Sequence, residues 1–379
     1  MRCGNVKQLI YADNAATTQL DSDAFEAMKP YLLSEYGNAS QPYSFSRTAR
    51  KALKESRETI AQCIGATPEE IFFTSGGTES DNWAIKGSAF SDADKRATLT
   101  SMIEHHAILK ACESIERLGY PVAYLPVDST GTVQPGLLSE WITNRTRLVS
   151  IMLANNEIGS VQDIATLSEI AHSHNALFHT DAVQAVGHLD IDVNALGVDM
   201  LSASAHKFNG PKGIGFLYIR KGTILAPYAS GGGQEFGMRA GTENVASIVG
   251  MAAALKKNCE LLHSTRDHLI FLEQKLIATL DACGVEFRRN GSQTRIPGNV
   301  SLSFPGWDGE ALLHRLDLMG ICVSTGSACD STNTQISHVL QAIGLEERYA
   351  KGTIRVSLGK NNTTNDVDSI ARALIKILK

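Results

Sequence analysis

Short apolar runs alternate with segments of helical periodicity over the part of the chain before about residue 259. Apolar positions that recur at helical spacing predict helices, whereas short uninterrupted apolar runs bounded by polar turns predict buried strands. Helices are predicted over residues 21–33, 46–64, 81–90, 106–118, 137–143 and 164–174, and strands over 71–74, 97–100, 122–125, 148–153, 176–179, 200–204 and 213–219. Strands separated by helices are typical of an α/β fold with a largely parallel sheet and helices on both faces.

The pattern changes from about residue 259 onward. A long helix is predicted over residues 251–280, followed by strands over 285–287 and 300–304, a helix over 310–319, strands over 321–323 and 354–357, and an amphipathic helix over 367–378. This pattern predicts a smaller α+β domain. We expect residues 14–258 to form a large domain, and residues 259–379 to form the small one together with an extended lead-in, residues 1–13.

Polar clusters follow four of the predicted strands. These clusters are Glu104-His105-His106, Asn155-Asn156-Glu157, Asp181-Ala182-Val183-Gln184 and Ser204-Ala205-His206-Lys207. In open parallel sheets, ligands bind outside the carboxyl ends of the strands. The four clusters therefore predict one shared ligand site.

Lys207 is the strongest candidate for covalent chemistry. Small residues and glycines surround it in the segment Ser202–Pro211, and they leave room beside its side chain. A buried lysine forms a Schiff base readily because burial favours its neutral, nucleophilic form. The alternative is a solvated turn lysine. Lys212 competes for the role, but its Gly-Pro-Lys-Gly context is typical of a turn that faces water.

A second candidate element is the glycine-rich turn Ser75-Gly76-Gly77-Thr78, between a predicted strand and a predicted helix. This arrangement points backbone N–H groups and a helix N-terminus at an anion such as a phosphate, and a threonine hydroxyl adds a donor. The alternative is an ordinary helix start capped by Thr78 or Ser75.

A Schiff-base lysine, a phosphate-binding turn and Asp181 at a strand end together indicate pyridoxal phosphate (PLP), whose ring nitrogen a buried carboxylate keeps protonated. His105 is suited to stack on the ring and move protons, and Gln184 and Asn156 to bind its phenolic oxygen. Each has an ordinary alternative: Asp181 and His105 as helix caps, Gln184 and Asn156 as loop amides.

The composition indicates the class of protein and its cellular compartment, and it leaves the hypothesis of a PLP site unchanged. The 379 residues are 43% hydrophobic and 20% charged, as in ordinary globular proteins. A net charge of −5 gives no reason to expect direct nucleic-acid binding. There is neither a membrane-length apolar run nor the apolar core of a signal peptide, and the seven cysteines include no Cys-x-x-Cys pair. These features predict a cytoplasmic protein with reduced thiols and without a zinc site.

Ten stretches spread over nearly the whole chain resemble those of a known family. They are YADNAATT, FFTSGGTESDNWAIKG, EHHAIL, NNEIGSVQDI, HTDAVQAVGH, SASAHKFNGPKGIGFLYIR, GGGQEFGMRAGTENVASIVG, STGSACDS, SHVLQAIGL and IRVSLG. The chain resembles the NifS-like, group I cysteine desulfurases, which are PLP enzymes of fold type I. The resemblance implies a homodimer with each active site at the subunit interface, L-cysteine as substrate, and a persulfide that passes to a sulfur-acceptor protein.

The resemblance also implies a role for individual residues. Lys207 would carry the Schiff base, Asp181 would pair with the ring nitrogen, His105 would stack on the ring, and Gln184 and Asn156 would lie near its phenolic oxygen. The phosphate would be bound by Gly77, Thr78, Ser204 and His206, with Thr242 from the partner subunit. Arg355 would hold the substrate carboxylate in a bidentate pair, and Cys329 would be the nucleophile.

The residues around Cys329 give independent support for that last role. Small polar residues on both sides predict a flexible loop over 324–333, and attack on a substrate sulfur followed by delivery elsewhere requires such a loop. Cys63 and Cys112 lie in helical patterns and Cys322 ends an apolar strand, so we expect these three to be buried. Whether Cys329 also binds an iron–sulfur cluster with a scaffold protein stays open.

The chain departs from the family pattern after Gly37-Asn38. Pro-Ser-Ser and a histidine are usual there, and Ala39, Ser40, Gln41 and Tyr43 stand instead, with Ser46 in place of a glycine. The pathway served therefore stays open between iron–sulfur assembly, tRNA thiolation and DNA phosphorothioation. Two other functions remain as alternatives: an aminotransferase of the serine–pyruvate type, and a non-catalytic sulfur-relay or scaffold protein.

Overall fold

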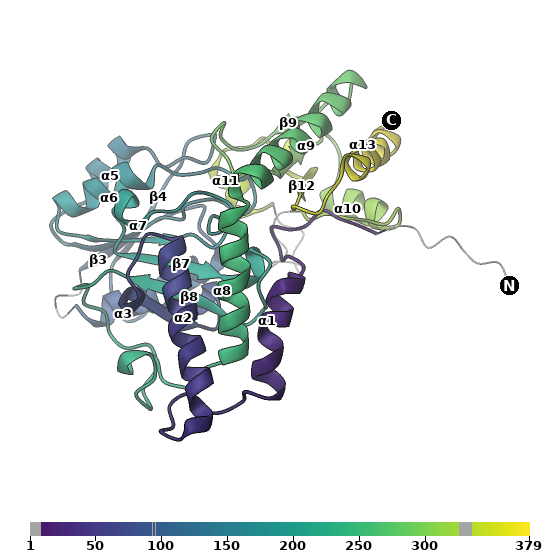
Figure 1. Ribbon diagram of the computed structural model, residues 1–379. Helices are drawn as coiled ribbons and strands as arrows, with labels where there is room; N and C mark the ends of the chain where they lie inside the picture. Colours follow the sequence, from purple (N-terminus) through teal and green to yellow (C-terminus); the bar gives the residue numbers. More distant parts are fainter. Residues whose placement is uncertain (1–8, 93, 95, 326–335) are drawn as a thin grey trace.

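A seven-stranded sheet lies at the centre of the molecule (Figure 1). The computed structural model describes residues 9–92, 94, 96–325 and 336–379. The strands are β2 (Ile71–Thr74), β3 (Ala97–Ser101), β4 (Val122–Leu125), β5 (Thr146–Ser150), β6 (Leu177–Asp181), β7 (Met200–Ser204) and β8 (Gly215–Ile219). Their order is β2-β8-β7-β6-β5-β3-β4; β8 runs antiparallel to both of its neighbours, β2 and β7, and the other neighbouring pairs are parallel. The predicted α/β fold with a mainly parallel sheet is confirmed.

Helices cover both faces of the sheet because successive side chains of a strand point to opposite sides. Val149 and Leu201 join one apolar core, whereas their neighbours Leu148 and Met200 join the other. The first core also takes side chains from α1 (Ser22–Leu33), α2 (Arg47–Cys63), α5 (Pro135–Trp141), α6 (Ile164–Ser173), the short α7 (Val193–Leu196) and α8 (Val245–Glu260). The second takes them from α3 (Gly77–Phe90) and α4 (His106–Glu116).

A smaller group of elements has an apolar core of its own. It consists of α9 (Leu262–Ala282), α10 (Gly309–Asp317), α13 (Thr364–Leu378), the antiparallel strands β9 (Arg288–Arg289), β10 (Asn299–Ser303) and β12 (Thr353–Ser357), and the parallel pair β1 (Ile10–Tyr11) and β11 (Ile321–Cys322). The described part of the lead-in, β1, therefore packs on this group. The short helices α11 (His338–Ala342) and α12 (Glu347–Ala350) contribute to a further small apolar cluster.

The single helix predicted over residues 251–280 is wrong. The chain leaves the helical conformation at Leu261 (φ −98°, ψ 4°), so that α8 ends at Glu260 and α9 begins at Leu262. Apolar residues continue through this point without glycine or proline, and the sequence therefore gave no stop signal. The break has a tertiary cause: α8 packs on the large sheet, whereas α9 packs in the core of the smaller group (Figure 1).

Other boundaries also differ from the prediction. Helix α3 begins at Gly77 rather than at residue 81, because the glycine-rich turn forms its first turn. Strand β5 covers residues 146–150 rather than 148–153, and the remaining apolar residues are buried beyond its end. No strand covers residues 285–287; Val285 and Phe287 instead pack against the core of the smaller group. Within the described ranges, no helix combines the length and apolar character needed to cross a membrane.

Candidate active site

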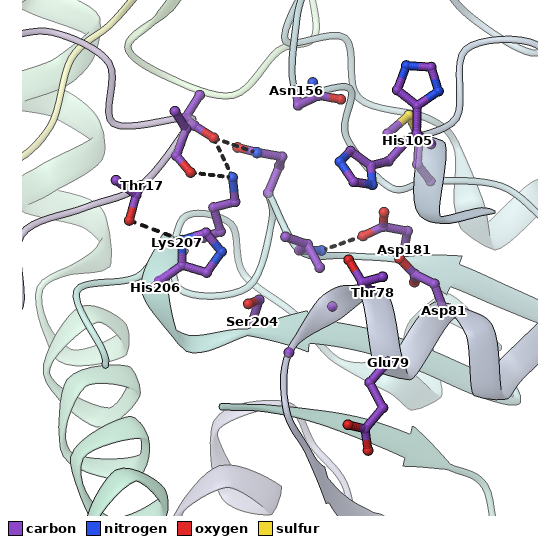
Figure 2. A pocket seen from close by; sticks show the side chains of 18 of the residues that line it. Thr17, Thr78, Glu79, Asp81, His105, Asn156, Asp181, Ser204, His206 and Lys207 are labelled. Carbon is purple, nitrogen blue, oxygen red and sulfur yellow. Dashed lines mark hydrogen bonds between the residues drawn. The ribbon is translucent and has the colours of Figure 1, made fainter. Parts of the chain in front are cut away.

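A cavity of about 520 Å³ opens near the carboxyl ends of β3, β5, β6 and β7. Its volume is in the range of sites that hold small organic ligands. Side chains from all four predicted polar clusters line it (Figure 2). Among the residues predicted to bind cofactor or substrate, the lining includes Gly77, Thr78, His105, Asn156, Asp181, Gln184, Ser204, His206, Lys207 and Arg355.

Lys207 ends a 3-10 turn (Ala205–Lys207) that directly follows β7. Its Nζ donates hydrogen bonds to the backbone carbonyl oxygens of Ala15 (2.6 Å) and Ala16 (2.8 Å), as Figure 2 shows. The amine is therefore held at the cavity, unlike the side chain of a solvated turn lysine. Lys212, by contrast, is an exposed residue at the edge of the cavity.

The N-terminus of α3 has the features of an anion site. Gly76, its N-cap, has φ 146°, a conformation that residues with a side chain rarely adopt, and no side chain caps the helix. The alternative of a start capped by Ser75 or Thr78 is therefore wrong. A Cβ on Gly77 would come within 2.6 Å of the Val183 side chain. The first N–H groups of α3 thus stay available to an anion in the cavity.

The first turn of α3 also contains a carboxylate, Glu79, whose negative charge is balanced by an arginine. Glu79 forms an ion pair with Arg239 (2.8 Å) and accepts a hydrogen bond from the Ser75 N–H (3.0 Å). Burial opposes the charged form of Glu79, yet these hydrogen bonds prevail and its pKa is lowered. Figure 2 shows the side chain pointing away from the other labelled residues, so Glu79 does not oppose anion binding at Thr78.

Asp181 is the last residue of β6 and is 5% exposed. Its Oδ1 accepts a hydrogen bond from the Val183 N–H (2.9 Å), so it caps a turn rather than a helix. Burial raises the pKa of Asp181 to about 6, against the opposing effects of the Val183 N–H and the positive charge of Lys207. A cationic N–H group in the cavity would stabilise its carboxylate further.

His105 is a helix cap that also lines the cavity. Its Nδ1 accepts the Ala107 N–H (3.1 Å) and so caps α4, while the residue also lines the cavity. Burial, followed by the charges of Lys207 and neighbouring histidines, lowers the pKa of His105 to about 4. The ring is therefore neutral near pH 7, and because Nδ1 is an acceptor, its proton is on Nε2.

The loop after β1 organises three of the predicted residues. In addition to the two hydrogen bonds from Lys207, the Ala15 carbonyl accepts one from Gln184 Nε2 (3.0 Å). His206 Nδ1 and Thr17 Oγ1 are hydrogen-bonded at 3.1 Å. Burial, followed by the charges of Lys207 and Lys212, lowers the pKa of His206 to about 4, so this ring is also neutral near pH 7.

Arg355 reaches the cavity from β12 and is 3% exposed. Its Nη2 donates to Asp13 Oδ1 (2.7 Å) and its Nη1 to the carbonyl oxygen of Asn156 (2.9 Å). Nε is buried and has no hydrogen-bond partner among the described residues. The orientation of the Arg355 guanidinium is thus fixed by Asp13, which follows β1, and by Asn156, which follows β5 of the large sheet.

Thr242 and Cys329 are the two remaining predicted site residues. Thr242 is exposed and lies outside its lining, and Cys329 lies outside the described residues. Of the cysteines expected to be buried, Cys112 is fully buried, and burial raises its pKa to about 12. Cys63 and Cys322 are only half-buried, which corrects the expectation for them.

Sequence reasoning missed several residues that shape the site. Asp13, Ala15 and Ala16 hold Arg355 and Lys207, and Asp81 lines the cavity from α3. Polar and small residues are concentrated over 13–18, and this composition is a signal that could have pointed to the loop. Asp81 is the first residue of the helix predicted over 81–90, and nothing in the sequence around it indicated that it would line the cavity.

Comparisons with known proteins agree over almost the whole chain. Residues 10–370 match the model of the aminotransferase class-V family. The cysteine desulfurase IscS of Dictyoglomus turgidum is 47% identical over 382 residues, which cover 99% of this chain and 95% of that protein. A solved structure called NifS-like protein has a TM-score of 0.92 at 39% identity, over 98% of this chain and 99% of the other. Another solved structure, described as SspA in complex with cysteine, has a TM-score of 0.83 at 36% identity. The match covers 93% of this chain and 100% of the other.

Proposed function

This chain belongs to the aminotransferase class-V family and is a PLP-dependent cysteine desulfurase, and we propose that the cavity described above is its active site. The observation that carries this assignment is that Lys207, Asp181 and the uncapped N-terminus of α3 all face one cavity. A reactive amine, a buried carboxylate and an anion site are the three groups that PLP requires of a protein.

The cavity residues fit the cofactor as follows. The N–H groups of Gly77 and Thr78, with the side chains of Ser204 and His206, would bind the phosphate. Asp181 would hold the proton on the ring nitrogen, and His105 would cover one face of the ring. Gln184 and Asn156 would reach the phenolic oxygen, and Lys207 would bind the cofactor covalently. When bound, PLP supplies an electron sink for the substrate bonds that break.

Arg355 would orient the substrate through its carboxylate. A planar guanidinium forms two parallel hydrogen bonds to a carboxylate, and Arg355 is already fixed by Asp13 and Asn156. Its buried Nε adds an N–H donor that no described residue uses. The negative charge of Asp13 keeps this cation stable inside the protein until a second carboxylate arrives.

We expect Arg355→Ala to raise the KM for cysteine far more than it lowers kcat, because a carboxylate anchor contributes to ground-state and transition-state binding alike. The loss should be about 2–5 kcal/mol, the range for a buried charge-assisted pair. Steady-state kinetics of alanine formation measure it. Arg295→Ala is the matched control, since Arg295 also binds backbone carbonyls but outside the cavity. An unchanged KM with lower thermal stability would make Arg355 a structural residue.

Cys329 would carry out the sulfur transfer. Its thiolate attacks the sulfur of the bound cysteine, the C–S bond breaks with its electron pair staying on the substrate carbon, and that carbon takes up a proton and leaves as alanine. The sulfur remains on Cys329 as a persulfide, which passes to an acceptor protein for iron–sulfur assembly or nucleic-acid thiolation. A reducing cytoplasm would keep this thiol active.

We further propose that the active form is a homodimer in which Thr242 of one chain contributes to the phosphate site of the other. In support, Thr242 is exposed and lies outside the cavity of its own chain. Large apolar side chains are exposed on and just after α1: Leu33 is 70% exposed, Tyr36 is 71% exposed, and the Tyr36 ring packs edge-on against Phe45. Exposed apolar surface of this kind is typical of subunit interfaces.

Subunit complementation tests this arrangement. Lys207→Ala and Thr242→Glu should each be inactive alone, the second because a carboxylate would repel the phosphate. Co-expressed, they should regain about a quarter of wild-type activity, since half of randomly paired dimers contain one intact site. The control pair is Lys207→Ala with Asp181→Ala, whose two defects lie in the same cavity and which should recover nothing. Absence of recovery in the first pair would place Thr242 outside the site.

A further inference from the structure

Asp21 is a buried carboxylate outside the candidate active site. It is the N-cap of α1, where its Oδ1 accepts the Asp23 N–H (2.9 Å). It also forms ion pairs with two lysines: Lys257 Nζ is 3.0 Å from Oδ1, and Lys360 Nζ is 2.9 Å from Oδ2. A helix cap requires only a side-chain acceptor, so the two lysines indicate a role beyond capping.

The two lysines come from different parts of the fold. Lys257 belongs to α8, which packs on the large sheet, whereas Lys360 follows β12 in the smaller group of elements. The pair of Asp21 with Lys257 therefore lies within the large group, and the pair with Lys360 connects the two groups. All three residues line a second cavity, of about 610 Å³, together with residues of α9. At this point charged side chains link the two groups across a cavity.

Both ends of the Asp21–Lys360 pair adjoin a residue of the proposed active site. The Asp21 N–H donates to the carbonyl oxygen of Asn209 (2.9 Å), which lies two positions after Lys207. Lys360 follows Arg355 by five positions, just beyond the end of β12. The ion pair thus connects the segment of the proposed Schiff-base lysine with the strand of the proposed carboxylate anchor.

The environment of the pair favours a lasting contact. The side chains of Asp21 and Lys360 are 7% and 18% exposed, so that salt screens their attraction less than that of a surface pair. Burial opposes the charged form of Asp21, but the hydrogen bonds from Lys360 and Lys257 prevail and lower its pKa to about 2. The carboxylate is therefore charged throughout the neutral pH range.

We propose that Asp21 and Lys360 are positioning residues that set the place of Arg355 relative to the Lys207 segment. Their ion pair holds the end of β12 against the loop after β7, so that one substrate reaches Arg355 with its carboxylate and the cofactor site with its amine. Without the pair, substrate binding itself has to bring the two groups into place, which weakens affinity. The inference rests on the proposed roles of Lys207 and Arg355.

The chain offers a matched pair of substitutions. Lys360→Met removes the ammonium group and keeps an apolar stem, and so breaks the link between the two groups. Lys257→Met makes the same chemical change on the other oxygen of Asp21, but within the large group alone. Lys360→Arg restores a cation and tests rescue.

The experiment measures the affinity for L-cysteine and for 2-aminoethanethiol, which lacks the carboxylate, through the absorption of the bound cofactor. It uses the Cys329→Ser background, so that cysteine is not consumed. Lys360→Met should bind cysteine about 2- to 30-fold more weakly, the range for substitutions that change the coupling between sites, and should bind 2-aminoethanethiol unchanged. Lys360→Arg should regain most of the affinity for cysteine, and Lys257→Met should keep the original ratio of the two affinities.

Asp21→Asn tests whether Lys360 acts through this carboxylate. It should show the same selective loss for cysteine, and adding Lys360→Met to it should have no further effect, because the pair is already broken. An additive loss would mean that Lys360 acts by another route and would overturn the inference.

Arg355→Ala is the reference for recognition of the substrate carboxylate. If it does not reduce the preference for cysteine over 2-aminoethanethiol, the proposed role of Arg355 is wrong. If it does and Lys360→Met does not, only the inference about the ion pair is overturned. Equal weakening of both ligands by Lys360→Met would make the pair merely stabilising, and an equal selective loss in Lys257→Met would refute a role that depends on linking the two groups.

Discussion

Lys207→Ala should abolish the visible absorption of the bound cofactor and lower alanine formation from cysteine by about 10²–10⁴-fold, the range for losing a general acid–base alone. The physical reason is that Lys207 is the amine held at the cavity, by the carbonyl oxygens of Ala15 and Ala16. Without it, PLP is bound only by noncovalent contacts. Absorption spectra of the purified protein and an assay of alanine measure both effects.

Lys212→Ala is the matched control for this experiment. Lys212 follows the same strand in the chain and lies at the edge of the cavity, but its side chain is exposed. We expect it to retain the coloured cofactor and most of the activity. If the Lys207 variant stayed yellow and fully active, the assignment of the cofactor site would be lost, whatever Lys212→Ala did.

The sequence predicted the large sheet well because most of its strands are buried on both faces, and such strands appear as largely apolar runs. The strands β2 and β7 match their predicted bounds, and so does β4, which is half-buried at the edge of the sheet. The break between α8 and α9 was not predictable in the same way. It depends on which of two cores each helix packs against, and the apolar spacing near Leu261 is the same on either side.

The candidate site was predictable where it follows strand ends. Lys207 and Asp181 come from local patterns, and the topology of a parallel sheet brings them together. Arg355 and Thr242 came only from the family resemblance, since nothing local marks a strand arginine or an exposed threonine. Asp13 could not be assigned a role because its partner, Arg355, is distant in the chain and meets it only in the folded structure.

Cys329→Ser should lower alanine formation by about 10³-fold or more while leaving cofactor binding intact, because the nucleophile is removed but the cavity is unchanged. A serine hydroxyl is too weakly acidic to replace a thiolate as the group that attacks the substrate sulfur. Adding cysteine should still change the absorption spectrum, since Lys207, His105 and Arg355 remain. Cys283→Ser, a half-buried thiol at the end of α9, is the matched control and should behave as wild type.

The same two measurements separate this function from its alternatives. An aminotransferase has no use for a loop thiol, so Cys329→Ser would leave its turnover largely intact. A non-catalytic relay or scaffold protein would form no alanine even with Cys329 present. Only a desulfurase that uses this cysteine combines alanine formation by the wild type, loss of that activity in the variant, and a spectral response to cysteine in both. Normal alanine release by Cys329→Ser would therefore refute the proposed sulfur-transfer step, because the substrate sulfur would then have left without its acceptor.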